Sequence, residues 1–115
     1  GEYKEKIFLF ESVIDLLSYR TLNPDVKGHF VSLNGNSMIG RIKELKLDEY
    51  KEINCCFDND EQGKIFTKKI QDNFYNNAVV KVITPNNKDF NDDLVIRVNQ
   101  NLSLSKKKDL GIGLG

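Results

Sequence analysis

The sequence predicts one α/β domain, built on a four-stranded and mainly parallel sheet with helices on both faces. Four strand-like segments alternate with helix-like segments along the 115 residues, which is the order of successive βαβ units. The strand-like segments are continuously apolar rather than alternating, as expected of strands covered on both faces. We therefore expect a Rossmann-like sheet over residues 6–98.

The first strand is predicted at residues 7–10 and is followed by a helix over about residues 12–20, which Asn23-Pro24 ends. The second strand, residues 29–33, closes at the turn residues Asn34-Gly35, and a helix over about residues 38–45 follows. The third strand covers residues 53–57 and precedes an amphipathic helix over residues 61–76. A fourth strand, residues 78–83, and a last helix, residues 91–98, complete the predicted domain.

The last segment, residues 99–115, is predicted to be a linker or a disordered tail. It has a lysine run followed by alternating glycines and lacks a sustained amphipathic period. Gly1 is not an initiator methionine, so we expect this chain to be one module of a longer protein.

Composition narrows the class of protein. Seventeen Lys and Arg residues balance seventeen Asp and Glu residues, so the chain lacks the strongly basic signature of a simple nucleic-acid binder. No apolar run approaches the roughly 20 residues that cross a membrane, and no signal peptide is recognisable. The two cysteines, Cys55 and Cys56, are adjacent and cannot frame a disulfide-stapled fold. We therefore expect a cytoplasmic protein with no membrane partner.

Acidic residues follow three of the four predicted strands. Glu11 follows the first strand, Asp58 and Asp60 follow the third, and Asp89 lies after the fourth. In parallel sheets the carboxyl ends of the strands share one edge, where ligands gather. Converging carboxylates without histidine suit a hard divalent cation, Mg²⁺ or Mn²⁺. The pattern predicts metal-assisted phosphoryl transfer.

Simpler interpretations stay open for several of these residues. Asp60 could serve only as the N-cap of the helix that follows it. For Asp15, a place on the solvated face of its helix is slightly favoured over a role in the acidic site. The lysines Lys64 and Lys68 are more simply the solvent face of an amphipathic helix than contacts to nucleic-acid phosphates.

An ordered series of motifs resembles the Toprim domain, which bacterial-type primases, topoisomerases, some nucleases and repair proteins share. The segments that carry the resemblance are FLFESVIDLLS at 8–18, SLNG at 32–35, FDNDEQG at 57–63, Pro85, and KDFND at 88–92. The motifs most resemble the primase-like Toprim domains of plasmid and mobile-element proteins, in which the Lys-Asp-x-Asn signature recurs. The resemblance covers about residues 6–98, which are therefore expected to form the Toprim domain.

The resemblance implies roles for individual residues. Glu11 corresponds to the family's glutamate, a general acid or base or a metal ligand. Asp58, Asp60 and Asp89 correspond to metal-binding acids. The accessory positions are Asp15, Gly35, Gly63, Lys88, Asn91 and Asp92.

The function expected from this resemblance is a Mg²⁺-dependent, primase-type nucleotidyl transfer, with DNA, nucleotides and further domains of a longer protein as partners. A metal-dependent nuclease and a non-catalytic recruitment module are the alternatives. A flavodoxin-like receiver is a more distant one, because it needs two acids after the first strand and only Glu11 stands there.

Overall fold

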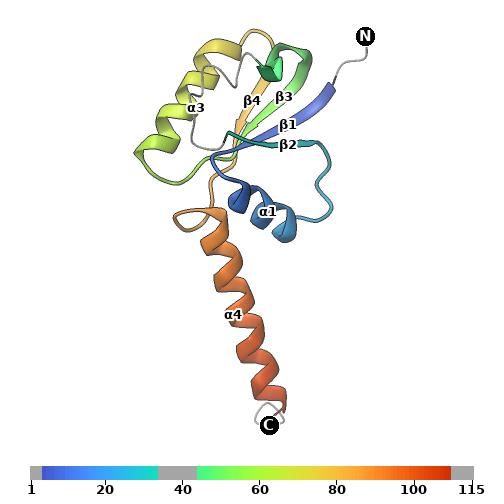
Figure 1. Cartoon of the computed structure of the whole chain (residues 1–115), viewed down its shortest axis with the longest axis vertical. Coiled ribbons are helices and arrows are strands. Elements are labelled where there is room, and N and C mark those ends of the chain that lie inside the picture. Colours follow the sequence, from blue (N-terminus) through green and yellow to red (C-terminus); the bar gives the residue numbers. More distant parts are fainter. Residues whose placement is uncertain (1–3, 34–43, 110–115) are drawn as a thin grey trace.

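The computed structural model describes residues 4–33 and 44–109. Its centre is a sheet of four strands: β1 (Lys4–Phe10), β2 (His29–Ser32), β3 (Tyr50–Cys55) and β4 (Val79–Val82). The strand order is β2-β1-β3-β4, and all three neighbouring pairs are parallel (Figure 1). The predicted four-stranded parallel sheet is therefore confirmed. The chain leaves β1 toward β2 on one side and later returns to β3 on the other, so the switch point lies at the carboxyl end of β1.

Helices cover both faces of this sheet, as predicted. Helix α3 (Glu61–Phe74) lies on one face, and α1 (Val13–Leu22) and α4 (Phe90–Asp109) pack against each other on the other face (Figure 1). A short 3₁₀ helix, η1 (Leu47–Glu49), leads into β3. Within the described residues, no helix combines the length and the apolar character needed to cross a membrane.

Strand β1 supplies the centre of both halves of the core. Ile7 and Leu9 pack on the α3 side, where Ile70 is the fully buried helix residue. Phe8 and Phe10 point to the opposite face and join an aromatic cluster with α1 and α4. Consecutive apolar residues are required in β1 because alternate side chains enter different layers.

Three strand boundaries differ from the predicted ones by two or three residues, and those of β2 and β4 differ by at most one. β1 begins at Lys4 and β3 at Tyr50, in each case three residues before the apolar run. The two strands extend this far because Lys4 and Tyr50 pair with each other at the amino-terminal ends of β1 and β3. β3 ends at Cys55, so the predicted strand residue Phe57 lies in the connection to α3. The predicted helix over residues 38–45 lies outside the described residues except for its last two, which are helical.

The prediction that the last helix ends near Val98 is wrong, because α4 continues to Asp109. No Gly or Pro interrupts residues 90–109, so nothing local stops the helix before Gly111. The second half of α4 extends away from the sheet (Figure 1), and Leu102 and Leu104 on it are exposed. Residues 99–109 are thus helical and not a frayed tail; their use as a linker stays a prediction.

The core assignment of Ile70 gives a direct test. Ile70→Ala is expected to lower the free energy of unfolding by about 2–5 kcal/mol, because it leaves a cavity between α3 and the sheet. Ile65→Ala in the same helix removes a half-exposed side chain and serves as the matched control. Urea denaturation measures both variants. Equal losses would contradict the packing described above.

Candidate metal centre

Three carboxylates from three elements meet at the carboxyl edge of the sheet. Asp15 comes from the first turn of α1, Asp58 from the connection after β3, and Asp89 from the residue before α4. One oxygen of each lies within 4.8 Å of the others. Clustered carboxylate oxygens are the ligands that Mg²⁺ and Mn²⁺ prefer, so these three residues could hold one such ion.

Asp15 is buried, which contradicts its interpretation as a solvated helix residue. Ser12 caps α1, and its hydroxyl donates to Asp15 Oδ2 at 3.0 Å while accepting from the Asp15 backbone N–H at 3.2 Å. The backbone N–H of Asn91 donates to Asp15 Oδ1 at 3.2 Å and so connects α1 to α4. Burial first, and the charge of Asp58 second, raise the pKa of Asp15 to about 6 despite these hydrogen bonds.

Asp58 and Glu11 lie beside each other because they follow the neighbouring strands β3 and β1. Burial, and then the proximity of the Glu11 carboxylate, raise the pKa of Asp58 to about 7. Asp58 Oδ1 and Glu11 Oε1 are buried and have no hydrogen-bond partner in the described part of the chain. Buried polar atoms are nearly always paired, so the two oxygens fit a site completed by a cation.

Asp60 has a different position from Asp58. It is the N-cap of α3, and its Oδ1 accepts a hydrogen bond from the Gly63 backbone N–H at 2.8 Å. The N-cap interpretation of Asp60 is therefore confirmed. Its carboxylate is not one of the three that converge within 4.8 Å, although its charge helps to raise the pKa of Asp58. Its role as a metal ligand stays a prediction.

Gly63 allows the first turn of α3 to approach the site. A Cβ atom at this position would overlap the backbone carbonyl oxygen of Asp58 and press on the rest of that peptide unit. A residue with any side chain would therefore push α3 away from Asp58. The helix can begin this close to the candidate centre only with glycine here.

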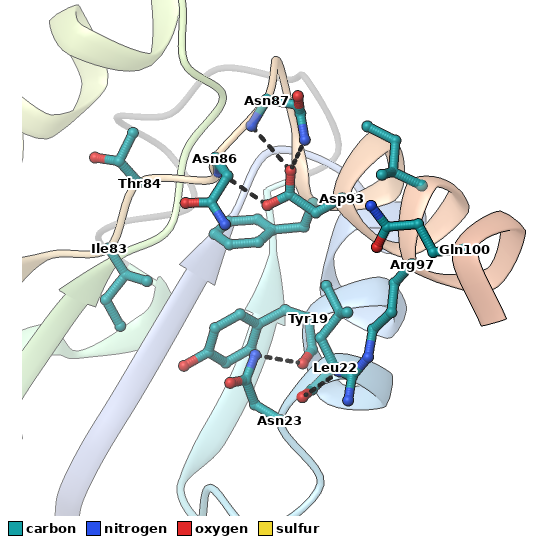
Figure 2. Close-up of a pocket in the computed structure, with 12 residues that line it drawn as sticks. Tyr19, Leu22, Asn23, Ile83, Thr84, Asn86, Asn87, Asp93, Arg97 and Gln100 are labelled. Atoms are coloured by element: carbon teal, nitrogen blue, oxygen red, sulfur yellow. Dashed lines mark hydrogen bonds between the residues drawn. The ribbon is translucent and has the colours of Figure 1, made fainter. Parts of the chain in front are cut away.

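The loop after β4 is fixed by Asp93, an acid after the fourth predicted strand to which the sequence alone assigns no role. Its Oδ2 accepts from the Asn86 backbone N–H at 2.9 Å, and its Oδ1 accepts from the Asn87 backbone N–H at 2.9 Å and from Asn87 Nδ2 at 2.7 Å (Figure 2). The Asn59 backbone N–H donates to the Lys88 carbonyl oxygen at 2.8 Å. These bonds hold the loop that carries Asp89 next to the loop that carries Asp58. An acid in the first turn of a helix is too common a feature to reveal such a role.

The remaining accessory residues differ in their surroundings. Asp89 Oδ1 caps α4 by accepting from the Asp92 backbone N–H at 2.8 Å, and Asp92 and Lys88 themselves are exposed. Asn91 Oδ1 accepts from the Ser18 hydroxyl at 3.4 Å. Gly35 lies outside the described residues.

Two lysines of α3 were candidates for phosphate contacts. Lys64 pairs with Glu61 at 3.9 Å and Lys68 with Asp72 at 3.5 Å, all within the same exposed helix face. This arrangement is the one expected of an ordinary solvent face. Contacts from these lysines to nucleic-acid phosphates stay a prediction.

Replacing Gly63 tests the close approach of α3. Gly63→Ala is expected to destabilise the protein by about 1–3 kcal/mol, the typical effect of overpacking, even though alanine has the higher helix propensity. Gln62→Ala, at an exposed position of the same turn, is the control and should have little effect. Thermal or urea unfolding measures both. A stabilised Gly63→Ala variant would show that α3 does not press on Asp58.

The raised pKa values of Asp58 and Asp15 make the metal-free protein pH-sensitive. Asp58 titrates near 7 in the native state against an ordinary 3.8, so the native state binds more protons between these values. The free energy of unfolding should therefore fall as the pH rises from about 4 to about 7. Asp58→Asn should flatten this decline by an amount on the order of 1–2 kcal/mol, allowing for solvent screening. Asp72→Asn, at an exposed position, is the control, and urea titrations in EDTA across this pH range provide the measurement. A pH profile unchanged by Asp58→Asn would contradict the carboxylate crowding.

Comparisons with known proteins agree with this fold. A search of curated proteins gave no match. Among solved structures, the chain is similar to the primase fragment of the bacteriophage T7 primase-helicase protein, with a TM-score of 0.64 and 22% sequence identity. The similarity covers 89% of this chain and 44% of that chain, so the present chain corresponds to less than half of the fragment. Residues 8–94 match the family described as Toprim-like, and the chain therefore belongs to the Toprim-like family.

Proposed function

We propose that this chain is the catalytic module of a DNA-processing protein and supports a Mg²⁺- or Mn²⁺-dependent nucleotidyl transfer of the primase type. The observation that carries the proposal is the meeting of Asp15, Asp58 and Asp89 within 4.8 Å, beside buried oxygens of Glu11 and Asp58 that have no partner in the described chain. Similarity of fold to the T7 primase fragment supports the primase type.

The residues that would hold the cation are Asp58 and Asp89, with Asp15 added to the set that the sequence indicated. Asp60 would contribute through the oxygen that does not cap α3. These acids would hold a divalent cation whose chemistry would be to neutralise phosphate charge and to align the attacking and leaving oxygens.

Glu11 is proposed to handle the proton of the attacking 3′ hydroxyl. Its carboxylate lies next to that of Asp58 and is not one of the three that converge within 4.8 Å, so it would act as a general base beside the cation rather than as one of its main ligands. The strand before it is hydrogen-bonded along both edges, because β1 is one of the two central strands and pairs with both β2 and β3. The proton acceptor would thus be held in a constant position relative to Asp58.

Two finer parts of the proposal concern the protein as a whole. Membership of the plasmid and mobile-element branch, and a cytoplasmic location, are proposed from the Lys88-Asp89-x-Asn91 motif and the two buried free cysteines. Further domains that bind the DNA template are proposed because this chain matches less than half of the T7 fragment.

Metal binding is the first test. Mn²⁺ titrated by calorimetry is expected to bind the unmodified chain, and Asp58→Asn should weaken that binding at least tenfold, or about 1.4 kcal/mol, since it removes a central ligand. Asp72→Asn, an exposed acid on α3, should bind as the unmodified chain does. Absence of binding, or equal binding by both variants, would favour the recruitment module instead.

The reaction type needs a second test, made on the longer protein that the proposal expects to contain this chain. Single-stranded DNA and labelled nucleotides should yield short extended products, and Glu11→Gln should lower their rate of synthesis by about 10²–10⁴-fold, the usual contribution of a general base. Sizing the products on a gel distinguishes synthesis from cleavage. Shortened DNA without incorporated label would identify a nuclease that uses the same carboxylates.

A further inference from the structure

A cavity of about 660 Å³ opens between the end of α1, the loop after β4 and the first half of α4 (Figure 2). Its volume is in the range of sites that take small organic ligands, roughly 300–1,000 Å³. None of the five acids proposed for catalysis and metal binding lines it. The cavity is thus separate from the candidate metal centre, and the proposed function assigns no role to it.

The inner wall of this cavity is apolar and aromatic. Tyr19 and Phe90 pack edge to face with ring centroids 5.2 Å apart, and both belong to the buried aromatic cluster. Ile83 and Leu22 extend this wall on either side. Tyr19 and Phe90 are themselves almost fully buried, so this wall closes the cavity toward the core, and recognition of a ligand depends on the polar groups around it.

Side-chain amides surround the aromatic wall. Asn23, Asn86 and Gln100 come from three different elements and line the same cavity (Figure 2). Asn23 Nδ2 donates to the Tyr19 carbonyl oxygen at 3.0 Å, which holds the Asn23 amide group at the edge of the cavity. An amide offers both donors and acceptors, and Asn and Gln are the residues that pair with the edges of nucleobases.

The two charged residues of the cavity, Asp93 and Arg97, favour a ligand that combines a neutral planar group with a nearby anionic group. Both oxygens of Asp93 already accept hydrogen bonds from the Asn86–Asn87 loop. Arg97 donates one long bond of 3.4 Å to the Leu22 carbonyl oxygen. Because a guanidinium carries five N–H donors and stacks on planar rings, Arg97 has further capacity to contact a base or a phosphate.

The cavity and the candidate metal centre share one loop. Phe90 lines the cavity, and the preceding residue, Asp89, belongs to the three converging acids; consecutive Cα atoms are about 3.8 Å apart. From this neighbourhood and from the lining chemistry, we infer that the cavity is a nucleobase-binding subsite. It takes the base of a free nucleotide or of a nucleotide within a single strand. The inference rests on the proposed function, which supplies a nucleotide as substrate.

Titration with nucleosides in EDTA tests this subsite independently of metal. Adenosine, guanosine, cytidine and thymidine at millimolar concentration are expected to shift the NMR signals of the Asn23, Asn86 and Gln100 side-chain amides. Ribose 5-phosphate, which has no base, should not shift them. Gln100→Leu should weaken nucleoside binding by about three- to tenfold, the effect of one lost hydrogen bond. Asn101→Leu, at the next exposed position of α4 and outside the cavity, should bind as the unmodified chain does.

Three outcomes would overturn the inference: no shift of these amides, shifts produced equally by ribose 5-phosphate, or identical weakening by both variants. A short oligonucleotide that binds more tightly than the mononucleotide identifies a strand as the source of the base, whereas equal affinities identify a free nucleotide. Asp58→Asn separates the two proposals, because in EDTA it should leave nucleoside binding unchanged. Nucleoside binding without Mn²⁺ binding would retain the subsite and reject the metal-dependent function; Mn²⁺ binding alone would do the reverse.

Discussion

The crowding of like charges at one edge of the sheet is the constraint on which this structure depends. Glu11, Asp15 and Asp58 approach one another where burial weakens solvation, and such an arrangement destabilises a fold unless protons or cations compensate. The raised pKa values of Asp15 and Asp58 show that protons can do so below about pH 6–7. At higher pH a divalent cation is the physically suitable substitute.

The surrounding fold holds these acids together through backbone contacts rather than through ion pairs. Ser12 and the Asn91 backbone N–H hold the Asp15 carboxylate, Gly63 allows α3 to approach the Asp58 backbone, and Asp93 fixes the loop that precedes α4. None of these contacts places a basic side chain next to the acids. Positioning without basic side chains leaves the negative charge of the acids available to a cation, as a metal centre requires.

The sequence was sufficient for the sheet, since continuous apolar runs and their alternation with helices follow directly from burial on both faces. It also placed Glu11 and Asp58 together, because parallel topology alone brings the ends of β1 and β3 to one edge. The burial of Asp15 could not be predicted from the sequence, because it depends on how α4 packs across α1. The length of α4 was also missed, because a polar helix that leaves the domain has no apolar period to reveal it.

The loop over residues 84–93 links the two sites in one structural unit. Thr84, Asn86 and Asn87 line the cavity, Asp89 joins the converging acids, and Asp93 connects the two ends of the loop by three hydrogen bonds. A nucleobase in the proposed subsite would therefore contact the same loop that presents Asp89 to the other two acids. Because hydrogen bonds already hold this loop, the fold sets the relative positions of the proposed subsite and the proposed metal centre before either is occupied.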